Sequence, residues 1–187
     1  MEYRALTVAR ECESGGDRIA ALVARRLGWK LLDGALIEEI ASLAHVDSQL
    51  ARQFDERVDS WVHRVSRRAL WHGAFEAVAV LPETAVFDAE TMALLARSAI
   101  EHAWETGACV IVGRGSQCVL RSRPDVFHVF LSAPADDDAV NEQRARYVQM
   151  NFGQEWRNPH LYDLMINSRI GEERVVSTIL AGMGYST

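Results

Sequence analysis

The sequence has few cysteines, no long apolar run and no excess of positive charge. Its three cysteines, Cys12, Cys109 and Cys118, are too few and too scattered for a disulfide framework or a CxxC metal site. No apolar run approaches the length of a membrane span, and the first residues lack the pattern of a signal peptide. The formal net charge of -6 argues against a general binder of nucleic acids or anionic membranes. We therefore predict a cytoplasmic protein with reduced thiols, without a nucleic-acid or membrane partner.

What the sequence does contain is an alternation of apolar strands and amphipathic helices. The 187 residues, 49% of them hydrophobic, suit one domain with a sizeable core. Strands are predicted over residues 3–9, 29–33, 108–115, 126–132 and 162–168. Helices are predicted over residues 16–27, 36–44, 54–70, 88–104, 141–150 and 172–183. Because several strands are apolar on both faces, we predict an α/β fold with a parallel sheet covered by helices. Ligands of such sheets bind beyond the carboxyl ends of the strands.

A glycine-rich turn joins the first predicted strand to the first helix, in the stretch "TVARECESGGDRIA". Such turns bind phosphate because their N–H groups converge and the helix dipole adds positive potential. The full motif is G-x-x-x-x-G-K-[ST]. When its second glycine is aligned with Gly15, Arg10 replaces the first glycine, Gly16 replaces the lysine, and Asp17 takes the hydroxyl position. A purely structural turn explains these residues equally well, so the motif alone leaves phosphate binding open.

Longer stretches carry a family resemblance. "LTVARECESGGDRIAALVARRLGWKLLD", "GACVIVGRGSQCVLRSRPDVFHVFLSAPADD" and "QRARYVQMNFGQEWRNPHLYDLMINSRIG" resemble the strands, loops and lid of the cytidylate-kinase-like family of P-loop proteins. The resemblance implies a P-loop NTPase fold in a single domain, 1–187, with a five-stranded parallel sheet in the order 2-3-1-4-5. It also implies a helical insertion that binds the nucleoside monophosphate (NMP) at about 36–85. A short or truncated lid would lie at about 134–146.

The resemblance further implies a nucleoside triphosphate and a small phosphoacceptor, CMP or similar, as partners. ATP and Mg²⁺ are the implied cofactors, held by the loop residues Ser14, Gly15, Gly16, Asp17 and Arg18. Arg18 would partly replace the absent lysine, although on a helix it could equally face water.

Four further residues match positions that carry the reaction in the family. Arg114 would reach the acceptor, Arg144 and Arg146 would approach the phosphates from the lid, and Asp33 would orient the acceptor or hold magnesium through water. Each has a plain alternative. Arg114 could be a surface arginine after a strand, the lid arginines a solvated helix face, and Asp33 a helix cap.

The chain also departs from true cytidylate kinases. Gly16 stands where the lysine belongs, and Gly115 replaces an acidic residue that helps to read the base. Gly34 and Glu39 replace a hydroxyl and an arginine that hold the monophosphate, and we expect Glu11 and Glu13 to surround the loop with negative charge. Loss of a charge clamp slows phosphoryl transfer by about 10³ to 10⁵. A catalytically degenerate nucleotide sensor or protein-interaction module is therefore the alternative.

Two other features are interpreted as structural. Trp61, Trp71, His63 and His72 lie on a predicted amphipathic helix and its edge, without metal-ligand spacing, so no metal site is predicted. The acidic run at 136–138 is interpreted as a solvated loop. Long helices in the insertion would also allow two subunits to pair, which makes a homo-oligomer an open expectation.

Overall fold

The computed structural model describes residues 2–33, 89–133 and 138–185. The chain divides into two compact units, one made of Met1–Gly34 with Ile100–Thr187 and the other of Ala35–Ala99. Of the second unit, only the residues that begin a long helix are described. The helices predicted at 36–44 and 54–70, the insertion at 36–85 and the start of the lid therefore lie outside the described residues.

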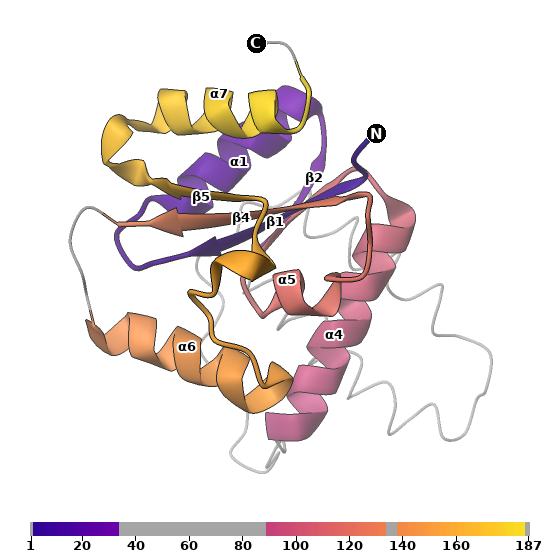
Figure 1. The fold of residues 1–187 in the computed structure, drawn as a ribbon. Coiled ribbons are helices and arrows are strands. Elements are labelled where there is room, and N and C mark those ends of the chain that lie inside the picture. Colours follow the sequence, from indigo (N-terminus) through magenta and orange to yellow (C-terminus); the bar gives the residue numbers. More distant parts are fainter. Residues whose placement is uncertain (1, 34–88, 134–137, 186–187) are drawn as a thin grey trace, which may run out of the picture. The chain divides into compact units, whose positions relative to one another are not determined.

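The first unit is built on a five-stranded parallel sheet (Figure 1). Its strands are β1 (Ala5–Arg10), β2 (Lys30–Leu32), β3 (Cys109–Val112), β4 (Val126–Ser132) and β5 (Leu164–Asn167). Their order is β2-β3-β1-β4-β5, which confirms the predicted fold class and strand order. β1 is central: Leu6 pairs with Val110 of β3 on one side and with Phe127 of β4 on the other. Because all strands run in one direction, their carboxyl ends meet at one edge of the sheet, which we call the carboxyl edge.

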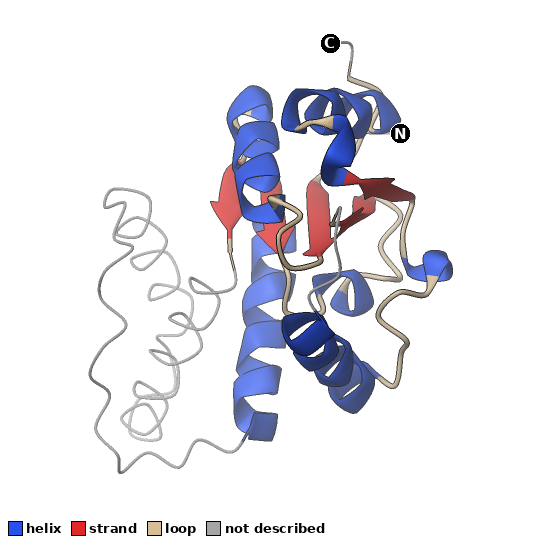
Figure 2. Cartoon of the chain, turned by 90° about the vertical axis from the view of Figure 1, so that its left-hand side faces the viewer, coloured by secondary structure: helices blue, strands red, loops and turns tan. Residues whose placement is uncertain are grey.

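Helices cover both faces of this sheet. They are α1 (Gly16–Leu27), α4 (Ala89–Thr106), α5 (Ser116–Val119), α6 (Asp138–Phe152) and α7 (Glu172–Gly182). α1 and α7 lie on one face, with α5 and α6 on the other (Figures 1 and 2). Two short 3₁₀ turns, Pro159–Leu161 and Ser168–Ile170, flank β5. α1 begins and ends at the predicted residues, whereas α5 was not predicted because four residues are too short for a periodic pattern.

The alternation of side chains along β1 builds two separate cores. Leu6 and Val8 pack with the apolar faces of α1 and α7. On the opposite face, Ala9 packs with Phe130 and with residues of α6 and the segment that follows it. A strand that is buried on both faces has no polar face, which is why its sequence has no period of two. None of the helices in the described ranges combines the length and the apolar composition that a bilayer crossing requires.

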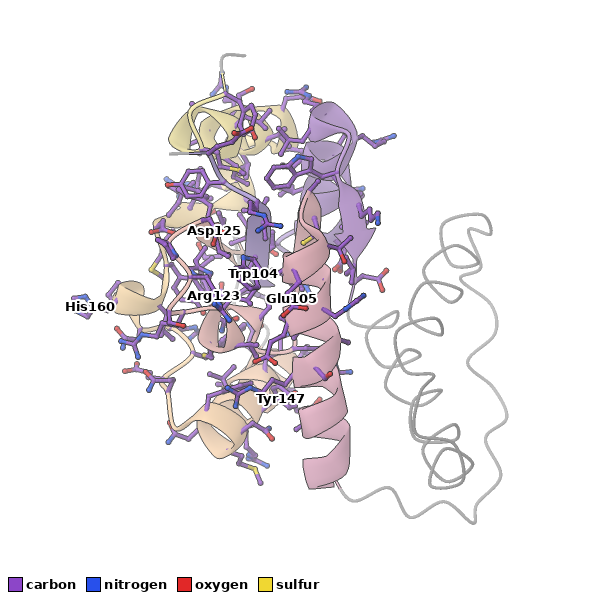
Figure 3. The ribbon with its side chains drawn as sticks, turned by 90° about the vertical axis from the view of Figure 1, so that its right-hand side faces the viewer. Trp104, Glu105, Arg123, Asp125, Tyr147 and His160 are labelled. Atoms are coloured by element: carbon purple, nitrogen blue, oxygen red, sulfur yellow. The ribbon has the colours of Figure 1, made fainter. Side chains whose placement is uncertain are left out.

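The amino edge of the sheet, opposite the carboxyl edge, is held by a cluster around Trp104 (Figure 3). The indole Nε1 of Trp104 donates to Asp125 Oδ1 at 3.1 Å, and the Arg123 guanidinium lies 4.0 Å from the centre of the ring. Arg4 donates to the carbonyl oxygen of Glu105 and also approaches the indole. We call Arg4, Trp104, Arg123 and Asp125 the amino-edge cluster. Its arginines are held by a neighbouring ring and by a backbone acceptor.

Candidate functional site

The loop between β1 and α1 is closed by its own hydrogen bonds. Ser14 is 3% exposed, and both its N–H and its hydroxyl donate to the carbonyl oxygen of Glu11. The N–H of Cys12 donates to the side chain of Asn141 on α6 at 2.8 Å. Glu13 and Gly15 both adopt left-handed conformations, with φ of 60° and 68°. The loop is therefore a defined turn, with the Ser14 hydroxyl directed inward at a backbone oxygen.

α1 starts directly from this turn without a side-chain cap. Gly15 is its N-cap residue and, as a glycine, provides no side-chain hydrogen bond to the first N–H groups of the helix. Uncapped N–H groups and the positive end of the helix dipole suit an anion. A carboxylate oxygen of Glu172, at the start of α7, is 3.6 Å from the point where a Cβ on Gly15 would stand, and Glu172 is ion-paired with Arg18. Arg18 is thus turned toward α7, with 76% of its side chain exposed.

Glu11 differs from the expectation that it adds negative charge around the loop. It is 8% exposed, and its carboxylate accepts the Ala133 N–H at 2.8 Å and pairs with Arg157 at 2.7 Å. These two partners neutralise it and fasten the loop to the end of β4. Glu13 is exposed, as expected of a charge at the loop surface. The sequence could not reveal the difference, because Arg157 is 146 residues away along the chain and reaches Glu11 only through the fold.

The structure places Arg114 and Arg144 at the same edge of the sheet. Arg114 has a φ of 53° in the turn after β3, and its guanidinium lies 5.7 Å from the centre of the Tyr147 ring on α6. Burial lowers the pKa of Arg114, and the charge of Arg10 lowers it further, while Tyr147 acts in the opposite direction. Arg144 donates to the carbonyl oxygen of Arg10 at 2.6 Å. Burial and then Arg10 also lower the pKa of Arg144.

These contacts make Arg10 a member of the site, together with Arg114 and Arg144. We call these three residues the arginine cluster. In the sequence, Arg10 stands out only as the residue at the position of the motif's first glycine. Its position as the last residue of a buried strand, at the carboxyl edge, is the signal that could have marked it. Asp17 lies beside it, with Arg10 Nη2 and Asp17 Oδ1 3.1 Å apart.

The other predicted residues are placed less centrally. Arg146 is exposed on α6, two residues beyond Arg144 and on a different side of the helix. Asp33 follows β2, one residue beyond Leu32, whose partner in the sheet is Ile111 of β3. It therefore lies at the carboxyl edge, separated from β1 by β3. The roles predicted for both residues stay predictions.

Gly115, in the turn after β3, is covered by an aromatic ring. Its φ is 67°, and a Cβ at this position would collide with the ring of Phe152 at the end of α6. Phe152 also packs edge-on against Tyr147, with 6.3 Å between the ring centres. The space beside Gly115 is thus filled by the Phe152 ring. Sequence reasoning found the substitution but not Phe152, which comes from a distant element.

No group of three or more histidine, cysteine, aspartate or glutamate side chains that could hold a metal ion occurs within residues 2–33, 89–133 and 138–185. This absence does not test the histidines predicted to be structural, because His63 and His72 lie outside those ranges.

Comparisons with known proteins agree with the fold. The model of the cytidylate kinase-like family matches residues 5–141. No curated protein matches the chain. Among solved structures, a protein from Eubacterium ventriosum ATCC 27560 is similar over 98% of this chain and 99% of its own, with a TM-score of 0.66 and 15% identity. Shikimate kinase from Aquifex aeolicus aligns over 96% of both chains, with a TM-score of 0.49 and 14% identity.

Proposed function

Because the chain belongs to the cytidylate kinase-like family, we propose that it binds ATP at the carboxyl edge and transfers its γ-phosphoryl group to a small acceptor such as CMP. ATP with Mg²⁺ would lie across residues 14–18, and the acceptor between Asp33 and Arg114. The observation that carries the proposal is the meeting of three arginines with the uncapped start of α1. The family model supports kinase-like chemistry, and ATP and CMP are our inference.

The electrostatics of the edge suit an anion with several charges. Burial removes water from Arg114 and Arg144, and the positive charge of Arg10 repels the positive charge of each. A bound polyphosphate would relieve this repulsion, because charge-assisted hydrogen bonds to guanidinium groups are among the strongest in proteins. Phosphoryl transfer requires mainly this kind of positioning and positive charge around the moving group.

Two carboxylates at the carboxyl edge could bind Mg²⁺. Asp17 holds the hydroxyl position of the motif, and 66% of its side chain is exposed beside Arg10. Asp33 follows β2. Mg²⁺ usually takes one or two carboxylates together with waters and phosphate oxygens, so these residues fit the ion. When bound, the ion would neutralise charge on the β- and γ-phosphates.

The experiment that tests the proposal is a calorimetric titration with ATP, CTP and CMP, each with Mg²⁺ and with EDTA. We expect heat for at least one triphosphate, and a stronger response with Mg²⁺. A thermal-shift screen adds a second measurement, since a ligand at 100 times its Kd adds about 2.7 kcal/mol of apparent stability. The absence of binding for every nucleotide, in both measurements, would contradict the proposal.

A second candidate is a catalytically degenerate nucleotide sensor or protein-interaction module. The glycine at position 16 favours it, because the loop has no lysine to follow the transferred phosphate. Turnover separates the two candidates. ADP formation that depends on a monophosphate, and that Arg114→Ala abolishes while the unfolding curve stays two-state, supports the kinase. Nucleotide binding without ADP formation, over a panel of nucleoside monophosphates and small alcohols, supports the sensor.

A further inference from the structure

Arg10 crosses the base of the loop between two glycines. Its Cβ and Cγ lie where a side chain on Gly16 would begin, since a Cβ there would be 2.6 Å from both atoms. At its other end, Nη1 is 2.5 Å from the point where a Cβ on Gly113 would stand. Only 17% of the Arg10 side chain is exposed. The missing side chains at positions 16 and 113 therefore leave a slot that the arginine fills.

The hydrogen-bonding capacity of Arg10 is only partly used. Its Nη2 pairs with Asp17, whose side chain is mostly exposed. Its Nε is buried and has no hydrogen-bond partner among the residues that the structure describes. A buried donor without an acceptor costs free energy, so this arrangement is costly in the free protein. An oxygen-rich ligand beside the loop would provide acceptors for the guanidinium.

Arg10 also lies close to the charges of Arg114 and Arg144. Arg144 contacts the Arg10 carbonyl oxygen, and Arg10 lowers the pKa of both neighbours. Buried like charges repel each other, and packing alone gives no reason to collect three of them at one edge. A multiply charged anion would convert the repulsion into attraction.

Neither Arg18, which was expected to replace the motif's lysine in part, nor the single lysine of the sequence occupies this place. Arg18 is paired with Glu172 at the start of α7 and is mostly exposed. Lys30 is the only lysine in the sequence, and it begins β2, at the amino edge of the sheet. Arg10, in contrast, stands at the position of the motif's first glycine, while a glycine stands at the position of its lysine.

We propose that Arg10 supplies the phosphate-binding cation of the loop, from the strand side, and that this chain has exchanged the motif's glycine and cation between positions 10 and 16. The ligand class is the polyphosphate of a nucleoside triphosphate, so the inference rests on the proposed function. The close approach of the Arg10 stem to Gly16 links the two positions. A lysine at position 16 would collide with Arg10, and Arg10 can cross the loop only because position 16 is a glycine.

The first test compares Arg10→Gln and Arg10→Lys with Arg26→Gln by calorimetry with ATP. Arg26 is a matched control, because it is also an arginine paired with a carboxylate, that of Glu173. It lies in the last turn of α1, at the end of the helix away from the loop. We expect Arg10→Gln to weaken ATP binding roughly 10- to 100-fold, the value of a charge-assisted hydrogen bond. Arg10→Lys should retain part of the affinity, and Arg26→Gln all of it. If Arg10 contacts phosphate, the affinity for adenosine should be the same in the Arg10 variants and in the unaltered protein.

The second test exchanges the two positions. Gly16→Lys adds a positive charge, so simple electrostatics predicts tighter ATP binding. Our proposal predicts weaker binding, because the new Cβ displaces the Arg10 stem. The double variant Arg10→Gly/Gly16→Lys restores the usual order of the motif. It should bind ATP at least about fivefold more tightly than Arg10→Gly alone or Gly16→Lys alone, since neighbouring positions couple.

The outcomes separate this inference from the proposed function. If the unaltered protein binds no nucleotide, the proposed function fails and this inference with it. If the unaltered protein binds ATP and Arg10→Gln binds it within twofold, only this inference is overturned. A double variant no better than the single ones would overturn the exchange of positions. Urea unfolding of each variant shows whether a loss of binding reflects a loss of fold, and Arg10→Lys, which keeps the charge, decides the case if Arg10→Gln does not fold.

Discussion

Arginines gather at both edges of the same sheet, but in opposite circumstances. At the amino edge, Arg123 lies over the Trp104 ring, and Arg4 donates to a backbone oxygen. At the carboxyl edge, the buried Nε of Arg10 has no hydrogen-bond partner within residues 2–33, 89–133 and 138–185. Burial and mutual charge there lower the pKa values of Arg114 and Arg144.

This difference shows what marks a site in a chain whose cations are nearly all arginines. The number of arginines does not mark it, because both edges have them. The amino-edge cluster satisfies its charges with a ring and backbone oxygens, as a structural cluster does. The arginine cluster brings three half-buried cations together and, within the part of the chain that the structure describes, leaves the buried Nε of Arg10 without an acceptor, which is expected where a ligand completes the arrangement. Substitutions at the amino edge should therefore change stability, and substitutions in the arginine cluster should change nucleotide binding.

The largest effect should come from a methyl group at the carboxyl edge. Gly115→Ala pays for a left-handed backbone and also drives a Cβ into the Phe152 ring. We expect a loss of about 3 kcal/mol in the free energy of unfolding, from roughly 1–2 for the backbone and 1–3 for overpacking. Gly107→Ala at the amino edge is the control, since its φ is 75° but the nearest atoms belong to the movable end of Arg4. It should lose only about 1–2 kcal/mol.

Urea unfolding measures both values. Phe152→Ala in the Gly115→Ala background should recover part of the loss, because it removes the ring that the new Cβ meets. Equal losses at positions 115 and 107 would show that Phe152 does not hold the turn.

Trp104→Ala should weaken the fold without changing nucleotide binding. It removes the hydrogen bond to Asp125 and the ring beneath Arg123. We expect a loss of about 2 kcal/mol for this half-buried tryptophan, below the value for a fully buried one. ATP titration of the folded variant should give the Kd of the unaltered protein. A large change in Kd would mean that the two edges are not independent.

Arg144→Gln should give the reverse result. It removes a cation of the arginine cluster and its bond to the Arg10 carbonyl oxygen. We expect ATP binding to weaken about tenfold, which corresponds to 1.4 kcal/mol. Stability should change little, because the repulsion from Arg10 is lost as well. Arg146→Gln is the matched control on the same helix, exposed and on another side, and comparison of the two titrations decides whether position 144 is special.

Much of the fold was predictable from local pattern. α1 is bounded by Gly15 and Gly28, both left-handed, and its apolar face is continuous, so its limits follow from the sequence. β4 also has the predicted limits. Other ends moved by up to three residues, as for β3, predicted over 108–115 and found at Cys109–Val112, because the glycines after it form a turn rather than a strand. The strand order was predicted from the family resemblance, because the local sequence of a strand does not indicate which other strands it pairs with.

The site was less predictable, for a physical reason. The motif located the loop, and the strand ends located Arg114. The partners that decide the electrostatics, however, lie far away in sequence: Arg157 beside Glu11, and Phe152 over Gly115. Such contacts depend on packing of the whole unit. The expectation that Glu11 adds negative charge around the loop was therefore wrong, because Arg157 pairs with its carboxylate. The importance of Arg10 also became visible only with its two glycine neighbours in place.

The smallest expected effect concerns His128, which lies inside β4, between the two edges of the sheet. It lies on β4, where its Nδ1 is 2.7 Å from the Thr7 hydroxyl and its backbone N–H donates to Asp163. Burial lowers the pKa of His128 from 6.5, and Asp163 opposes the shift only in part. The folded protein therefore keeps the imidazole neutral at a pH where the unfolded chain has already bound a proton. Stability from this group is complete above pH 6.5 and is lost as the pH falls through that value.

We expect His128 to cost up to about 1.4 kcal/mol of unfolding free energy per pH unit below 6.5, which is the limit for one proton. Urea unfolding at pH 7.5, 6.5 and 5.5 measures this slope. His128→Gln should flatten it, even if the variant is less stable at every pH. His160→Gln, at an exposed position, should leave the slope unchanged. Neither substitution should alter ATP binding at pH 7.5, because neither residue belongs to the arginine cluster, so a change in Kd with His128→Gln would extend the site from the carboxyl edge into the middle of the sheet.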